Sequence, residues 1–236
     1  MKTPAPSVVR LAGELTDRDA ADPFVDELNR WLTSSPRFQQ FATTYRSKIR
    51  KKVRTASDAE TLRDVRAELL AARLLLADKR FTVAYEAYGA GRGGPDLTVA
   101  YRMSSPFNLE VTRLRKPPDP DAVGATLLVK LRQLPPSVPN VVVLAIDRLV
   151  SEVDLAGSVR ALRARADAKD DAFFERRGLE DSRGFYERFL RLGAVIGWCD
   201  VAAGDERAAM WANPSARIAL PESASRACLG CFARPR

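Results

Sequence analysis

The chain has 236 residues, of which 46% are hydrophobic and 29% are charged, so it can bury one substantial core without a disulfide framework. It contains no histidine, which excludes His-dependent catalytic triads and His-containing metal sites, and its three cysteines fit a reduced compartment. The net charge of +8 favours an anionic partner, nucleic acid above all, although an arginine-rich composition alone would give the same charge. No apolar run reaches the roughly 20 residues of a spanning helix, and no secretory leader follows Met1. We therefore expect a cytoplasmic protein with no membrane association.

The first predicted elements are helices, and one of them is basic. Residues 1–20 are expected to form a loose arm with one short helical stretch, and Asp22–Leu32 a helix. Over Phe38–Arg54, apolar residues recur at helical spacing among basic ones, with no acidic residue. The basic face is either simply solvated or turned toward phosphates. In the second interpretation, the candidate contacts to the DNA backbone are Arg46, Lys48, Arg50, Lys51 and Lys52.

A longer helix and a group of strands follow. Ser57 and Glu60 have the spacing of a capping box, which predicts a helix from Ser57 to about Asp78. The apolar pattern then changes from helical to alternating spacing. The strands expected there are Phe81–Glu86, Leu97–Tyr101 and Phe107–Thr112. The last two are expected to pair as a hairpin.

The rest of the chain alternates helices with apolar strands. The helices expected are Ala122–Leu134, Asp154–Arg176 and Gly184–Leu192, and the strands are Asn140–Ile146, Ala194–Trp198 and Ala209–Ala212. The strand at 140–146 is apolar on both faces, which is typical of a central strand. This order predicts an α/β fold, a mixed β-sheet with a central hairpin flanked by helices. We place a helical N-terminal extension over residues 1–56 and the α/β domain over 57–236.

Two acidic residues of the hairpin are candidates for chemistry. Asp96 stands at the start of one strand and Glu110 lies on the returning strand, so the hairpin brings them within reach of each other. Glu110 and Thr112 are two residues apart and point to the same face. Two converging carboxylates repel each other unless a cation lies between them, and oxygen-only ligation suits Mg²⁺ or Mn²⁺. The alternative is a turn residue at Asp96 and an ion-paired strand carboxylate at Glu110.

The pattern Pro95-Asp96, then Glu110-Val111-Thr112, resembles the PD-(D/E)XK, or restriction-endonuclease-like, nuclease superfamily. Glu68 in the preceding helix, and the order helix, three strands, helix, strand over residues 57–147, extend the resemblance. It implies a restriction-endonuclease-like core and metal-dependent cleavage of nucleic acid, with DNA favoured. In this resemblance Asp96, Glu110 and the Val111 carbonyl would ligate Mg²⁺ or Mn²⁺, and Glu68 would hold a metal-bound water.

Thr112 departs from the pattern of that superfamily, which usually has a lysine at this position. A threonine hydroxyl can hydrogen-bond a water but brings no positive charge, so Lys130, Arg113 or Lys116 would have to supply it. We therefore assign Thr112 and Lys130 as candidate water or phosphate contacts. The alternatives are a catalytically silent protein of the same fold that binds nucleic acid or regulates a partner, and an interaction protein with no nucleic-acid role. A single centre that cuts both strands of a duplex would imply a homodimer.

Two further motifs carry weaker implications. The glycine-rich stretch 89–94 lacks the Lys-Ser/Thr ending of a P-loop and leads into a strand, so we expect a turn, with Arg92 and Arg113 near a phosphate. Cys228 and Cys231 have the spacing of a zinc knuckle. Because Cys199 is the only other thiol and there is no histidine, a structural zinc site is not favoured.

Overall fold

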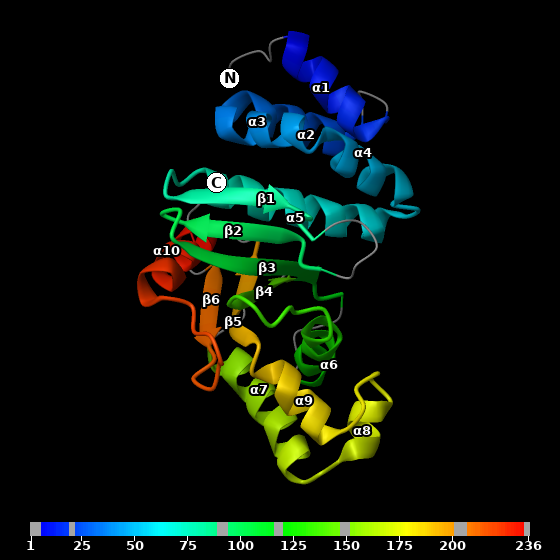
Figure 1. Ribbon diagram of the computed structural model, residues 1–236. Helices are drawn as coiled ribbons and strands as arrows, with labels where there is room; N and C mark the ends of the chain where they lie inside the picture. Colours follow the sequence, from blue (N-terminus) through cyan, green and yellow to red (C-terminus); the bar gives the residue numbers. More distant parts are fainter. Residues whose placement is uncertain are drawn as a thin grey trace.

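The protein contains a six-stranded mixed sheet whose strands follow one another in chain order (Figure 1). The computed structural model describes residues 6–18, 22–88, 94–115, 120–146, 152–200 and 207–233. The strands are β1 (Phe81–Tyr85), β2 (Leu97–Tyr101), β3 (Ser105–Arg113), β4 (Asn140–Ile146), β5 (Leu192–Cys199) and β6 (Ala208–Ala212). The strands β3, β4 and β5 are parallel, whereas β1, β2 and β6 run antiparallel to their neighbours.

Helices cover both faces of this sheet. They are α1 (Pro6–Thr16), α2 (Pro23–Ser34), α3 (Pro36–Thr44), α4 (Arg46–Thr55), α5 (Ala59–Leu76), α6 (Pro120–Leu131), α7 (Glu152–Asp167), α8 (Asp171–Glu175), α9 (Ser182–Phe189) and α10 (Glu222–Ala233). Helices α1–α5 and α10 share a core with one face, and α6–α9 with the other (Figure 1). The expected α/β fold with a helix-flanked mixed sheet is confirmed. No helix in the described ranges has both the length and the apolarity to cross a membrane.

The strand β4 is buried along its whole length because both helical layers cover it. Val141 and Val143 belong to the core beneath α1–α5, whereas Val142 and Leu144 belong to the core beneath α6–α9. This follows from the alternation of side chains along a strand. The central strand predicted at 140–146 is therefore confirmed.

The strands β2 and β3 form the predicted hairpin. They pair antiparallel, with Leu97 opposite Leu109. The helix α6 then carries the chain back so that β4 can add parallel to β3. The hairpin places the start of β2 beside the second half of β3, where the candidate carboxylates lie.

The basic segment is two helices, so the single helix predicted over Phe38–Arg54 is wrong. Between α3 and α4, Tyr45 has φ −102° and ψ 20°, which interrupts the helical path. No proline or glycine lies at this junction. The Tyr45 ring packs against Phe41 at 5.0 Å and Tyr85 at 6.3 Å between centroids, so tertiary packing at the junction accompanies the break.

The predicted cap of the long helix is wrong by one residue. Asp58, rather than Ser57, is the N-cap of α5, and its carboxylate accepts a hydrogen bond of 2.7 Å from the Thr61 N–H. Aspartate and serine are equally good at this position. Glu60, the other half of the expected capping box, accepts a bond from Arg113 instead.

Several boundaries in the second half also differ from the prediction. The helical segment expected over Asp154–Arg176 is divided into α7 and α8, and α9 ends at Phe189, which lets β5 begin at Leu192. The helix α10 is not predicted from the sequence patterns described above. Its apolar side packs on the sheet through residues such as Phe232, whose ring lies 5.2 Å from that of Trp198.

The N-terminal helices are continuous in packing with the sheet. Val8, Leu28, Phe38 and Ile49 lie in the same buried cluster as Leu109 of β3. The domain boundary placed at residue 56 stays a prediction, because one buried core contains residues from both sides of it.

The outer strand β1 is contacted at both of its ends by basic side chains. Arg37 of α3 donates to the Phe81 carbonyl at 2.5 Å and to two carbonyls at the C-terminal end of α5. Lys48 of α4 donates to the carbonyls of Tyr85 at 3.0 Å and Glu86 at 2.7 Å. These bonds fix α3 and α4 against β1.

Candidate active site

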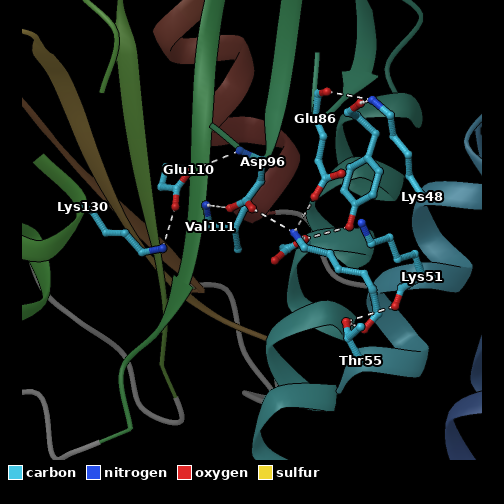
Figure 2. Close-up of polar contacts among 11 residues, drawn as sticks. Lys48, Lys51, Thr55, Glu86, Asp96, Glu110, Val111 and Lys130 are labelled. Atoms are coloured by element: carbon cyan, nitrogen blue, oxygen red, sulfur yellow. Dashed lines mark hydrogen bonds and ion pairs between the residues drawn. The ribbon is translucent and has the colours of Figure 1, made fainter. Parts of the chain in front are cut away.

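Asp96 and Glu110 meet at the end of the β2–β3 hairpin. The Asp96 N–H donates to Glu110 Oε2 at 3.2 Å, and the Val111 N–H donates to Asp96 Oδ2 at 2.9 Å (Figure 2). Glu110 is only 3% exposed. The convergence expected from the hairpin is confirmed, and it comes from the β2–β3 register.

Glu68 reaches the same place from α5. It is 7% exposed, and its Oε2 accepts hydrogen bonds from the Tyr85 hydroxyl at 2.9 Å and the Lys52 ammonium at 2.5 Å. Tyr85 is itself fully buried at the end of β1. The helix α5 thus brings a third acidic side chain beside the hairpin.

Lys52 is the residue that joins these carboxylates, a role that differs from the contact to the DNA backbone expected for it from the sequence. Its Nζ lies 2.5 Å from Glu68, 3.2 Å from Asp96 and 3.4 Å from Glu86. It also lies 5.3 Å from the centre of the Tyr85 ring, as in a cation–π contact. The sequence signal was its place beside the buried Val53, at the border of the apolar stripe of α4.

A second ammonium group lies at the other end of the line. Lys130 of α6 donates to Glu110 Oε1 at 2.6 Å (Figure 2). The contacts therefore run without interruption from Lys130 through Glu110, Asp96 and Lys52 to Glu68. Thr112 lies half-buried on β3, on the wall of a cleft that Lys130 also lines.

Burial makes two of these carboxylates unusually basic. Burial, together with the neighbouring charge of Asp96, raises the pKa of Glu68 to about 8 and that of Glu110 to about 7. Burial opposes the charge of Lys130, but the adjacent Glu110 carboxylate outweighs it and raises the Lys130 pKa. The site thus holds its lysines charged and disfavours full ionisation of its acids.

The charge balance of this cluster fits a divalent cation. In its ion pairs four carboxylates, including Glu86, share two ammonium groups, and all candidate ligands are oxygens of the kind that Mg²⁺ and Mn²⁺ prefer. As arranged in the described part of the chain, no three acidic or cysteine side chains surround one point. Lys52 and Lys130 occupy the carboxylate oxygens instead, so a metal would compete with these lysines for the same atoms.

The other predicted phosphate contacts are spread over the outer surface of α4 and its neighbours. Arg46 pairs with Glu14 at 2.9 Å and Arg50 with Asp17 at 3.3 Å, both in exposed positions. Lys51 is exposed. Lys48 is occupied by the β1 carbonyls, and Arg113 pairs with Glu60 at 3.0 Å and Asp64 at 3.6 Å. Arg92 and Lys116 lie outside the described residues.

The three cysteines do not meet. Cys199 lies in the core beneath α6–α9, whereas Cys228 and Cys231 lie in the core on the opposite face of the sheet. The sheet therefore separates Cys199 from the other two, and the three thiols cannot ligate one zinc ion.

Comparison of this chain with protein-family models, curated proteins and solved structures gives no match.

Proposed function

We propose that the protein is a metal-dependent nuclease that hydrolyses phosphodiester bonds in nucleic acid, with DNA favoured and with Mg²⁺ or Mn²⁺ as its metal. The observation that carries this proposal is the convergence of Glu68, Asp96 and Glu110, whose side chains are largely buried, on one hydrogen-bonded line. Burying carboxylates is costly unless cations or hydrogen bonds compensate. A cluster of buried carboxylates that destabilises the fold unless it is compensated, at the edge of an open cleft, is typical of a functional site.

Each acidic residue of the cluster is assigned a role in this proposal. Asp96 and Glu110, with the Val111 carbonyl, would hold the metal, which supplies Lewis-acid stabilisation of the phosphate and lowers the pKa of water when bound. Lys52 and Tyr85 both donate to Oε2 of Glu68, so Oε1 would accept a hydrogen bond from the attacking water. Lys52 and Lys130 would offset negative charge on the phosphate, and the Thr112 hydroxyl would orient the water.

The element order supports assignment to the PD-(D/E)XK type. The helix α5, the strands β1–β3, the helix α6 and the strand β4 follow one another in the order that the resemblance implies. Glu68 lies on the helix, Asp96 at the start of the second strand and Glu110 on the third. We infer a restriction-endonuclease-like core from this agreement.

A second candidate function is a catalytically silent module of the same fold that binds nucleic acid or regulates a partner. The observation that favours it is that Lys52 and Lys130 already satisfy the carboxylates by direct ion pairs. A site stabilised in this way holds its acidic residues together without any metal.

Titration of Mn²⁺ into the protein by calorimetry tests the proposal. We expect a dissociation constant below about 1 mM for the wild type. Asp96→Asn and Glu110→Gln each remove a ligand charge and should weaken binding by at least about tenfold. The matched control is Glu187→Gln, an exposed carboxylate of α9, which should leave the affinity unchanged.

The same proteins are then incubated with labelled DNA and Mg²⁺. Cleavage by the wild type and by Glu187→Gln, with none by the two site variants, supports the nuclease. Metal binding without cleavage favours the silent module. Absence of both contradicts the proposal.

A further inference from the structure

A cleft of about 760 Å³ lies beside the linked carboxylates of the candidate site. Most of its lining side chains are either cationic or apolar. Its lining includes Lys130, which donates to Glu110, so the cleft lies beside the candidate site. Arg113 and Arg115 follow from the end of β3, and Arg177 comes from the segment after α8. The rest of the lining is Thr112 and Leu114, at the end of β3, and one face of α6.

The α6 face in the cleft carries a strip of small apolar side chains, together with the polar side chains of Asp121, Thr126 and Lys130. Ala122, Ala125 and Val129 recur at helical spacing and line the cleft together. Val129 is 49% exposed, although a branched apolar side chain on a helix usually packs into a core. The strip therefore offers a flat apolar surface with room beside it.

Arg177 stands across the cleft as a fixed cation. Its guanidinium lies 3.7 Å from the centre of the Phe173 ring and donates to the Phe173 carbonyl at 3.1 Å. Arg165 stacks on the same ring at 4.2 Å and has Asp170 as an ion partner at 3.2 Å. Among the described residues, no carboxylate forms an ion pair with Arg177. A half-buried guanidinium without an acidic partner is a ready site for an anion.

Arg115 adds a second cation that can exchange its partner. It is 55% exposed and pairs with Asp64. Ion pairs this exposed contribute little net stability, so a phosphate can replace the carboxylate at small cost. Two guanidinium groups and an apolar strip thus share one cleft beside the candidate catalytic carboxylates.

We propose that this cleft binds a single, unpaired nucleic-acid strand, with a base against the apolar strip of α6 and phosphates on Arg115 and Arg177. Single strands bind where cations follow the backbone and flat surfaces accept bases, and a guanidinium stacked on a ring can serve as such a surface. Bases in a duplex are paired and stacked, so their faces cannot reach the strip. The inference rests on the proposed function, because it assigns the substrate class of the same site.

Fluorescence anisotropy in EDTA tests the inference without metal or catalysis. The probes are a fluorescein-labelled oligonucleotide of about 12 nucleotides, as DNA and as RNA, and the blunt DNA duplex of the same sequence. The variants are Arg177→Met, which removes the cation, and Ala125→Leu, which fills the cleft without changing charge. The matched control is Arg176→Met, because Arg176 is the exposed neighbour outside the cleft.

We expect the wild type to bind a single strand at least about tenfold more tightly than the duplex. Arg177→Met should weaken single-strand binding by roughly 5- to 20-fold and lower the salt slope by about 0.7, as for the loss of one phosphate contact. Ala125→Leu should weaken binding with an unchanged slope, and Arg176→Met should stay within about twofold of the wild type. The DNA and RNA strands identify which backbone the cleft accepts.

Equal affinity for strand and duplex, or equal effects of Arg177→Met and Arg176→Met in proteins with wild-type circular dichroism, would overturn the inference. Single-strand binding through Arg177 without any hydrolysis supports this inference and contradicts the nuclease. If the protein hydrolyses duplex DNA and Arg177→Met leaves this activity unchanged, the result supports the nuclease and contradicts this inference.

Discussion

Glu68 lies on α5 beside a second carboxylate, Asp96, in a place almost closed to solvent. Its pKa is raised from the ordinary value of 4.5 to about 8, so the folded protein keeps a proton that the unfolded chain releases. The pKa of Glu110 is likewise raised from 4.5 to about 7, so this side chain also keeps its proton in the folded protein below that pH. In the window between these ordinary and raised values, unfolding releases protons, and the free energy of unfolding falls as pH rises.

We therefore expect the metal-free protein to melt at a lower temperature at about pH 8.5 than at about pH 5.5, by roughly 2–4 °C for each kcal/mol lost. Glu68→Gln, which has no proton to lose, should melt higher than the wild type at the upper pH and show a flatter profile. Thermal melts followed by circular dichroism across this range measure both effects.

Mg²⁺ should raise the melting temperature more at the higher pH, because a metal binds only the ionised carboxylates. Glu187→Gln serves as the control and should keep the wild-type profile, since its carboxylate is exposed. A wild-type profile that is flat, or that rises with pH, would contradict the assignment of these protons to the buried acids.

For individual residues, the sequence predicted the positions of the acidic side chains of the site better than those of the basic ones. Asp96 and Glu110 could be brought together because hairpin pairing is short-range and follows the strand period. Lys52 could not be placed in the same way, because its position depends on the turn at Tyr45 and on how α4 docks against α5. Periodicity shows which side of a helix is buried, but not which neighbouring element that side will contact.

Among the elements, β3 and β4 are joined by a buried amide pair. Asn108 donates to the Asn140 side-chain oxygen at 3.0 Å, and both residues are fully buried. The Asn140 amide nitrogen in turn donates to the carbonyls of Pro135, Val138 and Arg191 at 2.8 to 3.1 Å. A single side chain therefore satisfies backbone groups on both sides of the central strand.

We expect Asn140→Ala to destabilise the protein by about 2–3 kcal/mol, because it leaves buried polar groups without partners. Denaturant unfolding monitored by tryptophan fluorescence measures the change. Thr98→Ala is the control on β2, since its hydroxyl contributes one half-buried bond of 3.3 Å to Asn108, and it should cost less than about 1 kcal/mol. Equal losses in both variants would contradict a special role for Asn140.

The strands were more predictable than the helix ends. The apolar runs at 97–101 and 140–146 give the observed bounds of β2 and β4, because both are set by burial of alternating or continuous apolar side chains. The division of the basic segment at Tyr45 has no proline, glycine or cap residue to announce it. It coincides with aromatic packing between elements, which local sequence does not encode.

Across the whole molecule, the net charge of +8 is not simply an exposed basic surface. Part of the positive charge of α3 and α4 is held in internal contacts, as with Arg37 and Lys52. Arg46 and Arg50 keep exposed side chains, 56% and 47% accessible, in surface ion pairs with Glu14 of α1 and with Asp17 directly after it. Such pairs yield readily to phosphates, so the predicted DNA-backbone role of α4 falls mainly on these outer residues and Lys51.

The double variant Arg46→Ala/Arg50→Ala should therefore weaken binding to duplex DNA uniformly across sequences and reduce the salt slope by up to about 1.8 units. Arg30→Ala, which removes an exposed arginine that pairs with Asp26 of the same helix α2, is the control. Filter binding over a salt series measures the slopes. Identical slopes for the double variant and the control would show that α4 is simply a solvated face.

Substrate class also bears on assembly. The expectation of a homodimer assumed that two strands of a duplex must be cut by two centres. A cleft that accepts one unpaired strand makes each copy of the chain sufficient, so sedimentation of the active protein as a monomer would agree with the single-strand proposal.

The contacts of Arg37 and Lys48 with β1 have a consequence for solubility. The Arg102 N–H donates to the Arg80 carbonyl, and the Glu86 N–H donates to the Asp96 carbonyl. The backbone N–H and C=O groups of even-numbered residues in and beside β1 therefore point toward β2, whereas the carbonyls of Phe81 and Tyr85 point away from it. Those are the carbonyls that Arg37 and Lys48 occupy. An incoming strand from another molecule would find these two acceptors of β1 already occupied and two positive charges in its path. The two side chains that anchor the helical layer thereby also protect the open side of the sheet against aggregation.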